Sequence, residues 1–572
     1  MSHTATPRNG GEILVDALKL HGVEHTFCVP GESFLPALDA LHTVGDAIQT
    51  IICRQEGAAA HMAEAYGKLT GKPGVCLVTR GPGATNASIG VHTAMQDSTP
   101  LVLLVGQVGT NLLERQAWQE VDLRAMFGSM AKWVTQIDHL ERLPEMIGRA
   151  FKVAVSGRPG PVVVGLPEDV LYQRLDVADA PPHLCVQPHP GPADMQRLRE
   201  LIVQAQRPLL VLGGGGWSAQ ACADIETFAE HFQLPVGTVF RRQDLFDNTH
   251  PNYAGDIGVG INEALAARVQ RADLVIAVGA RLGETTTAGY TLLPVPTLHA
   301  TFVHVHADTD ELGKVYHPDL CINAGMAEFA QAASALAPDT RAERAAWAAD
   351  ANADYRDTLV PTAMPGALNL ADVITHLRQT VAANTVITNG AGNYTGWIHR
   401  FYAYPGFRTQ LAPASGVMGY GIPAACAAAI VHPDRPVICF AGDGCFLMNS
   451  QELATARQYR LPIVFIVVNN NMYGSIRMHQ EIHFPGKVFG TTLENPDFAA
   501  LAAAYGLEGM VVERTADFPA SLERALAAKQ GALIELRIDP EGITPRTTLS
   551  ALRSNSPHQL NNETSPPADG AR

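Results

Sequence analysis

Two short polar segments follow apolar runs in the last third of the chain. The run PVICFAG (436–442) leads into Gly442-Asp443-Gly444, and the run PIVFIVV (462–468) is followed by three asparagines. Carboxylate and amide oxygens are hard ligands that suit Mg²⁺, which fills the rest of its shell with phosphate and water. Glycines let backbone amides approach an anion closely. A lone GDG would be an ordinary turn with a capping aspartate, but the two segments together predict a metal-bound diphosphate anchor.

The elements that must position these groups are parallel strands and helices. Short apolar runs such as GVCLVT (74–79) and PVVVGLP (161–167) alternate with alanine-rich helical stretches through most of the chain. Runs that are apolar on both faces are typical of parallel strands covered by helices on each side. The sequence therefore predicts an α/β fold with three doubly wound parallel-sheet domains. A strand–helix–strand unit would bring Asp443 and Asn470 to one edge of a sheet, where such sheets bind ligands.

Two proline-containing stretches without clear periodicity, 176–193 and 355–368, predict linkers. The end of the chain is polar and rich in Pro, Ser and Asn, which predicts a flexible tail. The predicted parts are domains 1–175, 194–337 and 369–545, and a tail 546–572.

Several further motifs occur in an order that points to one family. They are EGAAAHMAEAYG (56–67), TRGPGATN (79–86), WQEVD (118–122), SGVMGYGIPAACAA (415–428) and NNNMYGSIRMHQ (469–480). With GDG and the paired asparagines, they make residues 1–545 resemble the acetolactate (acetohydroxyacid) synthase large subunits of the thiamine diphosphate-dependent enzymes. The resemblance implies a pyrimidine-binding domain, a central domain and a diphosphate-binding domain, in that order.

The resemblance also implies roles for individual residues. Glu56 would share a proton with the pyrimidine ring of the coenzyme, Met418 would wedge between its two rings, and the Gly416 carbonyl would accept a hydrogen bond from it. Alternatively, Glu56 is a glutamate that interacts with the dipole of its helix, and Met418 packs in a core. Asn471 is expected in a turn, since asparagine tolerates unusual backbone angles. The expected metal ligands are Asp443, Asn470 and the main-chain oxygen of Met472, and the expected cofactor-binding residues are these three with Glu56, Gly416, Met418, Gly442, Gly444, Tyr473 and Gly474.

The expected reaction is carboligation of 2-oxo acids. Pyruvate would lose carbon dioxide, and the remaining two-carbon unit would join a second carbonyl. A decarboxylase of the same family that does not ligate is the alternative. An alternative of another class is a flavin or nicotinamide oxidoreductase built on the glycine run PLLVLGGGGWS (208–218). The family's acidic flavin-site pattern is replaced by GARLGETTTAGY (279–290), so FAD is doubtful.

The substrate pocket departs from the family. His479 stands where biosynthetic acetolactate synthases carry a tryptophan that helps to select the acceptor. His479 is either a solvated helix residue or a polar addition to the pocket. Gln119 and Lys132 match family residues near the active-site entrance, although each could be a surface polar group.

Composition excludes other classes of function. The net charge of −15 argues against nucleic-acid binding, and no apolar run is long enough to span a bilayer. The nine cysteines are scattered without a C-x-x-C pair, and residues 1–10 lack the apolar core of a signal peptide. We therefore expect a cytoplasmic enzyme. Since the family shares its sites between two chains, we also expect a homodimer or homotetramer.

Overall fold

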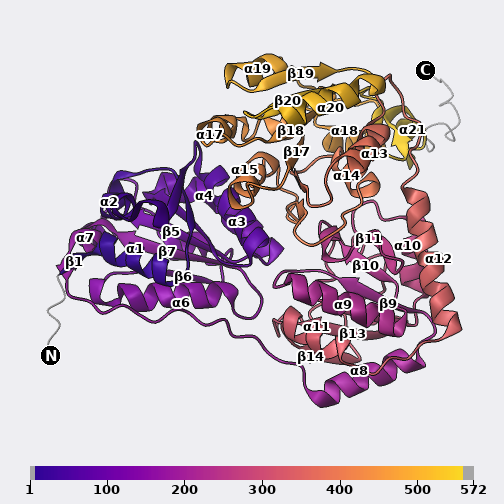
Figure 1. Cartoon of the computed structure of the whole chain (residues 1–572), viewed down its shortest axis with the longest axis horizontal. Coiled ribbons are helices and arrows are strands. Elements are labelled where there is room, and N and C mark those ends of the chain that lie inside the picture. Colours follow the sequence, from indigo (N-terminus) through magenta and orange to yellow (C-terminus); the bar gives the residue numbers. More distant parts are fainter. Residues whose placement is uncertain (1–6, 558–572) are drawn as a thin grey trace, which may run out of the picture. The chain divides into compact units, whose positions relative to one another are not determined.

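The structure is a computed structural model that describes residues 7–557 (Figure 1). These residues form two compact units. The first takes the chain up to Tyr355 together with Tyr404–Ser415 and Cys426–Val431. The second takes Arg356–Ala403, Gly416–Ala425 and the chain from His432 onward.

The first unit begins with a six-stranded sheet in the order β3-β2-β4-β5-β7-β6, with all strands parallel. Its central strands β5 and β7 are buried along their whole length, which explains their unbroken apolar sequences. The strands are β2 (His25–Cys28), β3 (Gln49–Ile52), β4 (Gly74–Thr79), β5 (Leu101–Gln107), β6 (Trp133–Gln136) and β7 (Pro161–Pro167), and the helices are α1 (Gly10–Leu20), α2 (Leu35–Val44), α3 (Glu56–Thr70), α4 (Arg80–Asp97), α5 (Leu123–Phe127), α6 (Leu143–Val155) and α7 (Glu168–Tyr172).

A second six-stranded parallel sheet follows in the same unit, in the order β11-β10-β9-β12-β13-β14. Two-residue strands β1 (Arg8–Asn9) and β8 (Arg174–Leu175) pair separately. The sheet consists of β9 (Pro208–Leu212), β10 (Val236–Val239), β11 (Tyr253–Ile257), β12 (Leu274–Val278), β13 (Thr301–His306) and β14 (Leu320–Asn323), with helices α8 (Pro192–Gln204), α9 (Ala219–Phe232), α10 (Glu263–Arg271), α11 (Met326–Ser334) and α12 (Ala342–Thr358).

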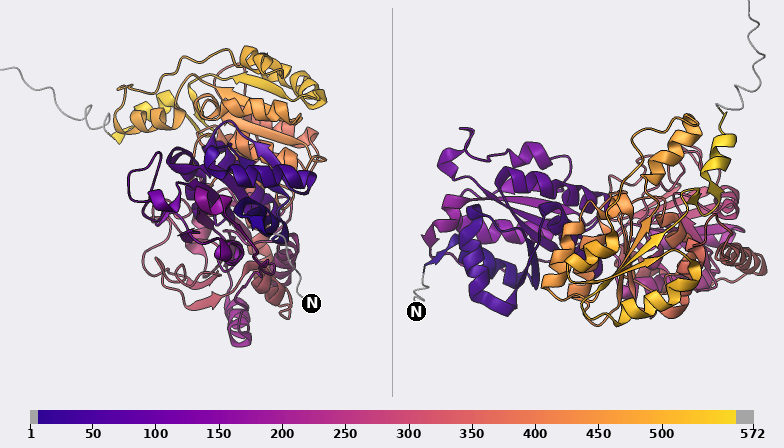
Figure 2. Two further views of the ribbon diagram at one scale, coloured as in Figure 1. Left: turned by 90° about the vertical axis from the view of Figure 1, so that its left-hand side faces the viewer. Right: turned by 90° about the horizontal axis from the view of Figure 1, so that it is seen from above.

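The second unit contains five parallel strands in the order β15-β17-β18-β20-β19. Figure 2 shows helices on both sides of these orange and yellow strands. The strands are β15 (Val386–Asn389), β17 (Val437–Gly442), β18 (Val464–Asn469), β19 (Glu508–Val512) and β20 (Ala532–Arg537). The helices include α13 (Leu370–Thr380), α14 (Thr395–Phe401), α16 (Asp443–Phe446), α17 (Leu453–Gln458), α18 (Gly474–His483), α19 (Phe498–Ala504) and α20 (Phe518–Ala527). Helix α15 (Gly421–Val431) belongs to this unit up to Ala425 and to the first unit from Cys426.

The predicted fold class is confirmed by these three doubly wound parallel sheets. In the first predicted linker, residues 176–191 contain no helix or strand, and α8 begins at Pro192. The second linker begins later than predicted, since α12 continues to Thr358. Within residues 7–557, no helix combines the length and the apolar character needed to cross a membrane.

The prediction of a flexible tail from residue 546 is wrong for its first part. Strand β22 (Thr547–Thr548) pairs with β21 (Gly542–Thr544), and helix α21 (Leu549–Ser554) follows. Arg553 of α21 donates two hydrogen bonds of 2.8 Å to the carboxylate of Glu481 in α18. Polar composition did not reveal this partner, because the carboxylate lies 72 residues away in the sequence. Residues 558–572 of the predicted tail lie outside the described residues.

Glu481 gives a prediction about stability. Its carboxylate is 1% exposed, and its hydrogen bonds from Arg553 and Arg477 lower its pKa from 4.5 to about 2. Because the folded-state pKa is depressed, the stabilisation is present above pH 4.5 and is lost as the pH falls towards 2. We expect Glu481→Gln to lower the local unfolding free energy of α21 by about 2 kcal/mol at pH 7. Hydrogen exchange of the α21 amides measures this loss of unfolding free energy at pH 7. At lower pH the difference between the variant and the unaltered protein should become smaller.

The exposed Glu494, for which no ion pair is seen in the described part of the chain, supplies the control. Glu494→Gln should leave α21 protection unchanged. Equal α21 protection in Glu481→Gln and the unaltered protein would contradict the assignment.

Candidate active site

A cavity of about 280 Å³ opens at the carboxyl ends of four strands in the second unit. Segments that follow β15, β17, β18 and β20 form most of its wall. Ligands of open parallel sheets bind at this edge. The structure thus brings together most of the residues predicted to bind the cofactor, and those that line the cavity are Gly416, Met418, Gly442, Asp443, Gly444, Asn470, Met472, Tyr473 and Gly474.

Asp443 is the first residue of α16 and is only 3% exposed. Its Oδ1 accepts a hydrogen bond of 2.8 Å from the Gly444 amide, and its Oδ2 accepts one of 2.8 Å from Asn495 Nδ2. Burial raises the pKa of Asp443, because the charged carboxylate loses water, while these two hydrogen bonds act in the opposite direction. A cation in the cavity would also favour the charged form of Asp443, as the hydrogen bonds do. The carboxylate therefore fits a metal ligand.

Asn470 leaves β18 at nearly the same height as Asp443 leaves β17, because Gly442 pairs with Val468 in the parallel register. The turn prediction for Asn471 is confirmed by its left-handed φ of 54°. After this turn Met472 forms an isolated bridge with Thr492. The cavity wall therefore contains the Asp443 carboxylate, the Asn470 amide and the main chain of Met472. Such a set of oxygen ligands fits Mg²⁺.

The loop that carries Gly416 and Met418 lies against α16. Gly416 and Gly419 have φ values of 69° and 80°, in the left-handed region that favours glycine. The amide of Gly419 donates to Cys445 Sγ at 3.2 Å. These constraints hold the half-buried Met418 in the cavity wall.

Glu56 belongs to the first unit, where it begins α3 as predicted. The side chain of the preceding Gln55 caps this helix by accepting a hydrogen bond of 2.9 Å from the Ala58 amide. Asn86 Nδ2 donates to Glu56 Oε2 at 2.9 Å. Glu56 as a residue is half-buried, the hydrogen bond from Asn86 lies at an exposed position, and the second carboxylate oxygen is not used in that bond.

Comparison with known proteins agrees with this geometry. The sequence matches the models for the N-terminal thiamine pyrophosphate-binding domain (residues 8–126), the central domain (195–333) and the C-terminal thiamine pyrophosphate-binding domain (390–536) of thiamine pyrophosphate enzymes. The acetolactate synthase large subunit of Parasynechococcus marenigrum is 34% identical over 93% of this chain and 87% of its own length. The chain belongs to the thiamine pyrophosphate enzyme family.

Other relatives of this thiamine pyrophosphate (diphosphate) enzyme have similar names. The acetolactate synthase isozyme 2 large subunit of Escherichia coli is 32% identical over 93% of this chain and 96% of its own length. A probable acetolactate synthase large subunit of Methanocaldococcus jannaschii is 32% identical over 94% and 93%, respectively.

None of the three predicted substrate residues is among those that line the cavity of the second unit, and two of them, Gln119 and Lys132, belong to the first unit. His479 is exposed on α18 and stacks on His483, with ring centroids 6.2 Å apart. Gln119 has a φ of 63°, and its main-chain oxygen accepts a hydrogen bond from the Gly81 amide at 2.8 Å. These contacts assign neither side chain to a substrate.

Lys132 is held by the fold of the first unit. Its Nζ donates to the carbonyls of Val153, Ser156 and Arg158 at 2.6, 2.8 and 2.7 Å. Burial lowers its pKa to about 8. Since all three donors are used, we do not include Lys132 among the substrate residues of the proposed function.

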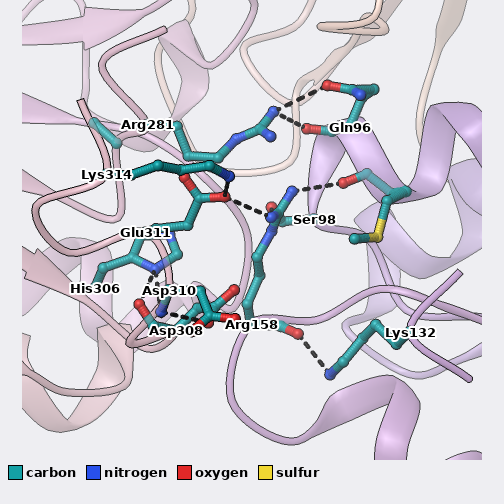
Figure 3. A network of polar contacts seen from close by, with 12 residues as sticks. Gln96, Ser98, Lys132, Arg158, Arg281, His306, Asp308, Asp310, Glu311 and Lys314 are labelled. Carbon is teal, nitrogen blue, oxygen red and sulfur yellow. Dashed lines mark hydrogen bonds and ion pairs between the residues drawn. The ribbon is translucent and has the colours of Figure 1, made fainter. Parts of the chain in front are cut away.

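The glycine run after β9 packs against the residue that follows α4. A Cβ on Gly215 would lie 2.0 Å from the Ser98 carbonyl oxygen, so this glycine is required by close packing. Figure 3 shows the neighbouring arginines engaged with the end of α4. Arg158 donates to Ser98 Oγ at 2.9 Å, and Arg281 donates to the Gln96 carbonyl at 2.5 Å. Gly215 is thus packed against Ser98, and with Gly216 and Trp217 it also lines a cavity of about 430 Å³. The proposed function does not depend on FAD.

Sequence reasoning missed the cavity residues that follow β15. Asn393 Oδ1 accepts a hydrogen bond of 2.7 Å from Ser475, and both side chains line the cavity. Trp397 also lines it, and its buried Nε1 has no partner among residues 7–557. The segment TNGAGNY (388–394) could have revealed them, since it follows an apolar run and combines glycines with polar residues.

Proposed function

We propose that this enzyme joins 2-oxo acids, as an acetolactate synthase does, with thiamine diphosphate and Mg²⁺ as cofactors. The observation that carries the proposal is the buried carboxylate of Asp443 beside Asn470 in a cavity at the carboxyl ends of parallel strands. The names of the relatives support pyruvate as the first substrate.

Each residue has a defined part in the proposed chemistry. Asp443, Asn470 and the Met472 carbonyl would hold the metal, which in turn would hold the diphosphate. Trp397 lies in the same wall, and its Nε1 has no hydrogen-bond partner among residues 7–557. Thiamine diphosphate bound there would supply a nucleophilic carbon and accept the electron pair that is left when carbon dioxide departs.

The other parts of the site orient the coenzyme and move a proton. Glu56 would hold a proton at a pyrimidine ring nitrogen, and Met418 would fix the ring geometry by contact, so that reacting groups are close before reaction. The Glu56 carboxylate retains an oxygen that Asn86 does not bond. The proposed working unit is a homodimer or homotetramer in which two chains share each site.

Product analysis tests the proposal. The enzyme, thiamine diphosphate and Mg²⁺ are incubated with pyruvate alone and with a panel of second 2-oxo acids, and the products are identified by mass spectrometry. We expect acetolactate from pyruvate alone. The Asp443→Ala variant is the control and should give no product. Acetaldehyde without any ligated product would overturn carboligation and leave a decarboxylase.

A further inference from the structure

Asn495 lies in the loop between α18 and α19, at the point where the metal-binding segments meet. Its Nδ2 is 2.8 Å from Asp443 Oδ2, 3.0 Å from Asn469 Oδ1 and 3.1 Å from Asn471 Oδ1. One amide nitrogen with two hydrogens therefore faces three oxygen acceptors. Asn495 connects the ends of β17 and β18 through a single group.

A chain of buried hydrogen bonds fixes the direction of this amide. Asn469 Nδ2 donates to Glu535 Oε1 at 2.8 Å, and Glu535, which is 1% exposed, is also held by Arg537 Nε at 3.0 Å. Because a carboxylate accepts and cannot donate, Asn469 must turn its Oδ1 towards Asn495. A flipped Asn495 would place its own oxygen against the Asp443 carboxylate, so its nitrogen must face Asp443.

The other end of the same amide has no partner within the described part of the chain. Asn495 Oδ1 is buried and accepts no hydrogen bond there. A buried acceptor without a donor costs about 1–3 kcal/mol. A donor that is not part of the chain would remove this cost, and water bound to a metal beside Asp443 is such a donor.

We propose that Asn495 is a positioning residue of the metal site. Its Nδ2 fixes Asp443 Oδ2, and its Oδ1 accepts a hydrogen bond from water in the shell of the metal. The inference rests on the proposed function, because it takes Asp443 as a metal ligand. Partners that orient metal ligands typically contribute about 10–100-fold to metal affinity.

Metal titration separates this role from a purely structural one. Full-length enzyme with thiamine diphosphate is titrated with Mn²⁺, and free Mn²⁺ is measured by electron paramagnetic resonance. We expect Asn495→Ala to raise the Mn²⁺ dissociation constant by about 10–100-fold. Glu494→Gln is the matched control, since it changes the neighbouring side chain of the same loop, which is exposed and forms no ion pair within residues 7–557. This control should bind Mn²⁺ as the unaltered enzyme does.

The thermal midpoint of each apoprotein is measured beside the titration. A lower midpoint in Asn495→Ala with an unchanged Mn²⁺ dissociation constant would overturn the proposal, because packing alone would then explain the residue. Asn495→Ser, whose hydroxyl is too short to reach the same acceptors, gives the same test if the alanine variant does not fold. Failure of the unaltered enzyme to bind Mn²⁺ with thiamine diphosphate would instead overturn the proposed function.

Discussion

Replacing Asp443 with alanine abolishes the retention of thiamine diphosphate and Mg²⁺ at concentrations that saturate the unaltered enzyme. Asn470 and the Met472 carbonyl would remain, and two neutral oxygens hold Mg²⁺ poorly against water. The expected loss of affinity exceeds the roughly 100-fold that follows the loss of a partner outside the ligand set. Quenching of tryptophan fluorescence by the coenzyme, with Trp397 in the cavity wall, measures this loss.

Asp443→Asn is the matched control, because it keeps the size of the side chain and removes the charge. The amide nitrogen of this variant must replace an oxygen that accepts a hydrogen bond from Gly444 or Asn495, so its apoprotein should unfold somewhat below the temperature of the unaltered apoprotein while remaining folded. The rise in midpoint that the cofactors cause through binding should disappear. If the alanine variant bound thiamine diphosphate with unchanged affinity and metal dependence, the site would lie elsewhere.

Replacing Glu56 with glutamine should slow activation of the coenzyme while its binding persists. The amide cannot share a proton with the pyrimidine ring, and loss of such a general acid–base group lowers rates by about 10²-fold or more. Nuclear magnetic resonance of proton exchange at the reactive carbon of the coenzyme measures the step directly. Near-normal exchange in this variant would contradict the role of Glu56.

The same two inactive variants test the proposed sharing of sites between chains. Co-expressed Glu56→Gln and Asp443→Ala chains should form hybrid dimers. With shared sites, one site of each hybrid carries both changes and the other carries neither, so part of the activity returns. Hybrids that form and remain inactive would exclude the shared arrangement.

Local sequence was enough to predict the site residues that directly follow strands. The apolar runs before Asp443 and Asn470 predicted parallel strands. The register of β17 and β18 brings the two residues to the same edge of the sheet. Asn495 was beyond such reasoning, because its partner Asp443 is 52 residues away and joined to it only by tertiary packing. Lys132 was misleading for the same reason, since only the folded chain shows three carbonyls around its ammonium group.

The docking of α21 on α18 has a consequence for how the enzyme could be switched off. Helix α18 begins at Gly474 in the cavity wall, and Glu481 lies in its last turn. Arg553 donates a hydrogen bond to Glu481. Ser556 adds a hydrogen bond of 2.7 Å to the Ile482 carbonyl. A chain that lacked residues 549–556 would lose these contacts, and we expect the end of α18 to fray. Every residue proposed to hold the coenzyme would still be present, yet the helix that begins in the cavity wall would be less stable.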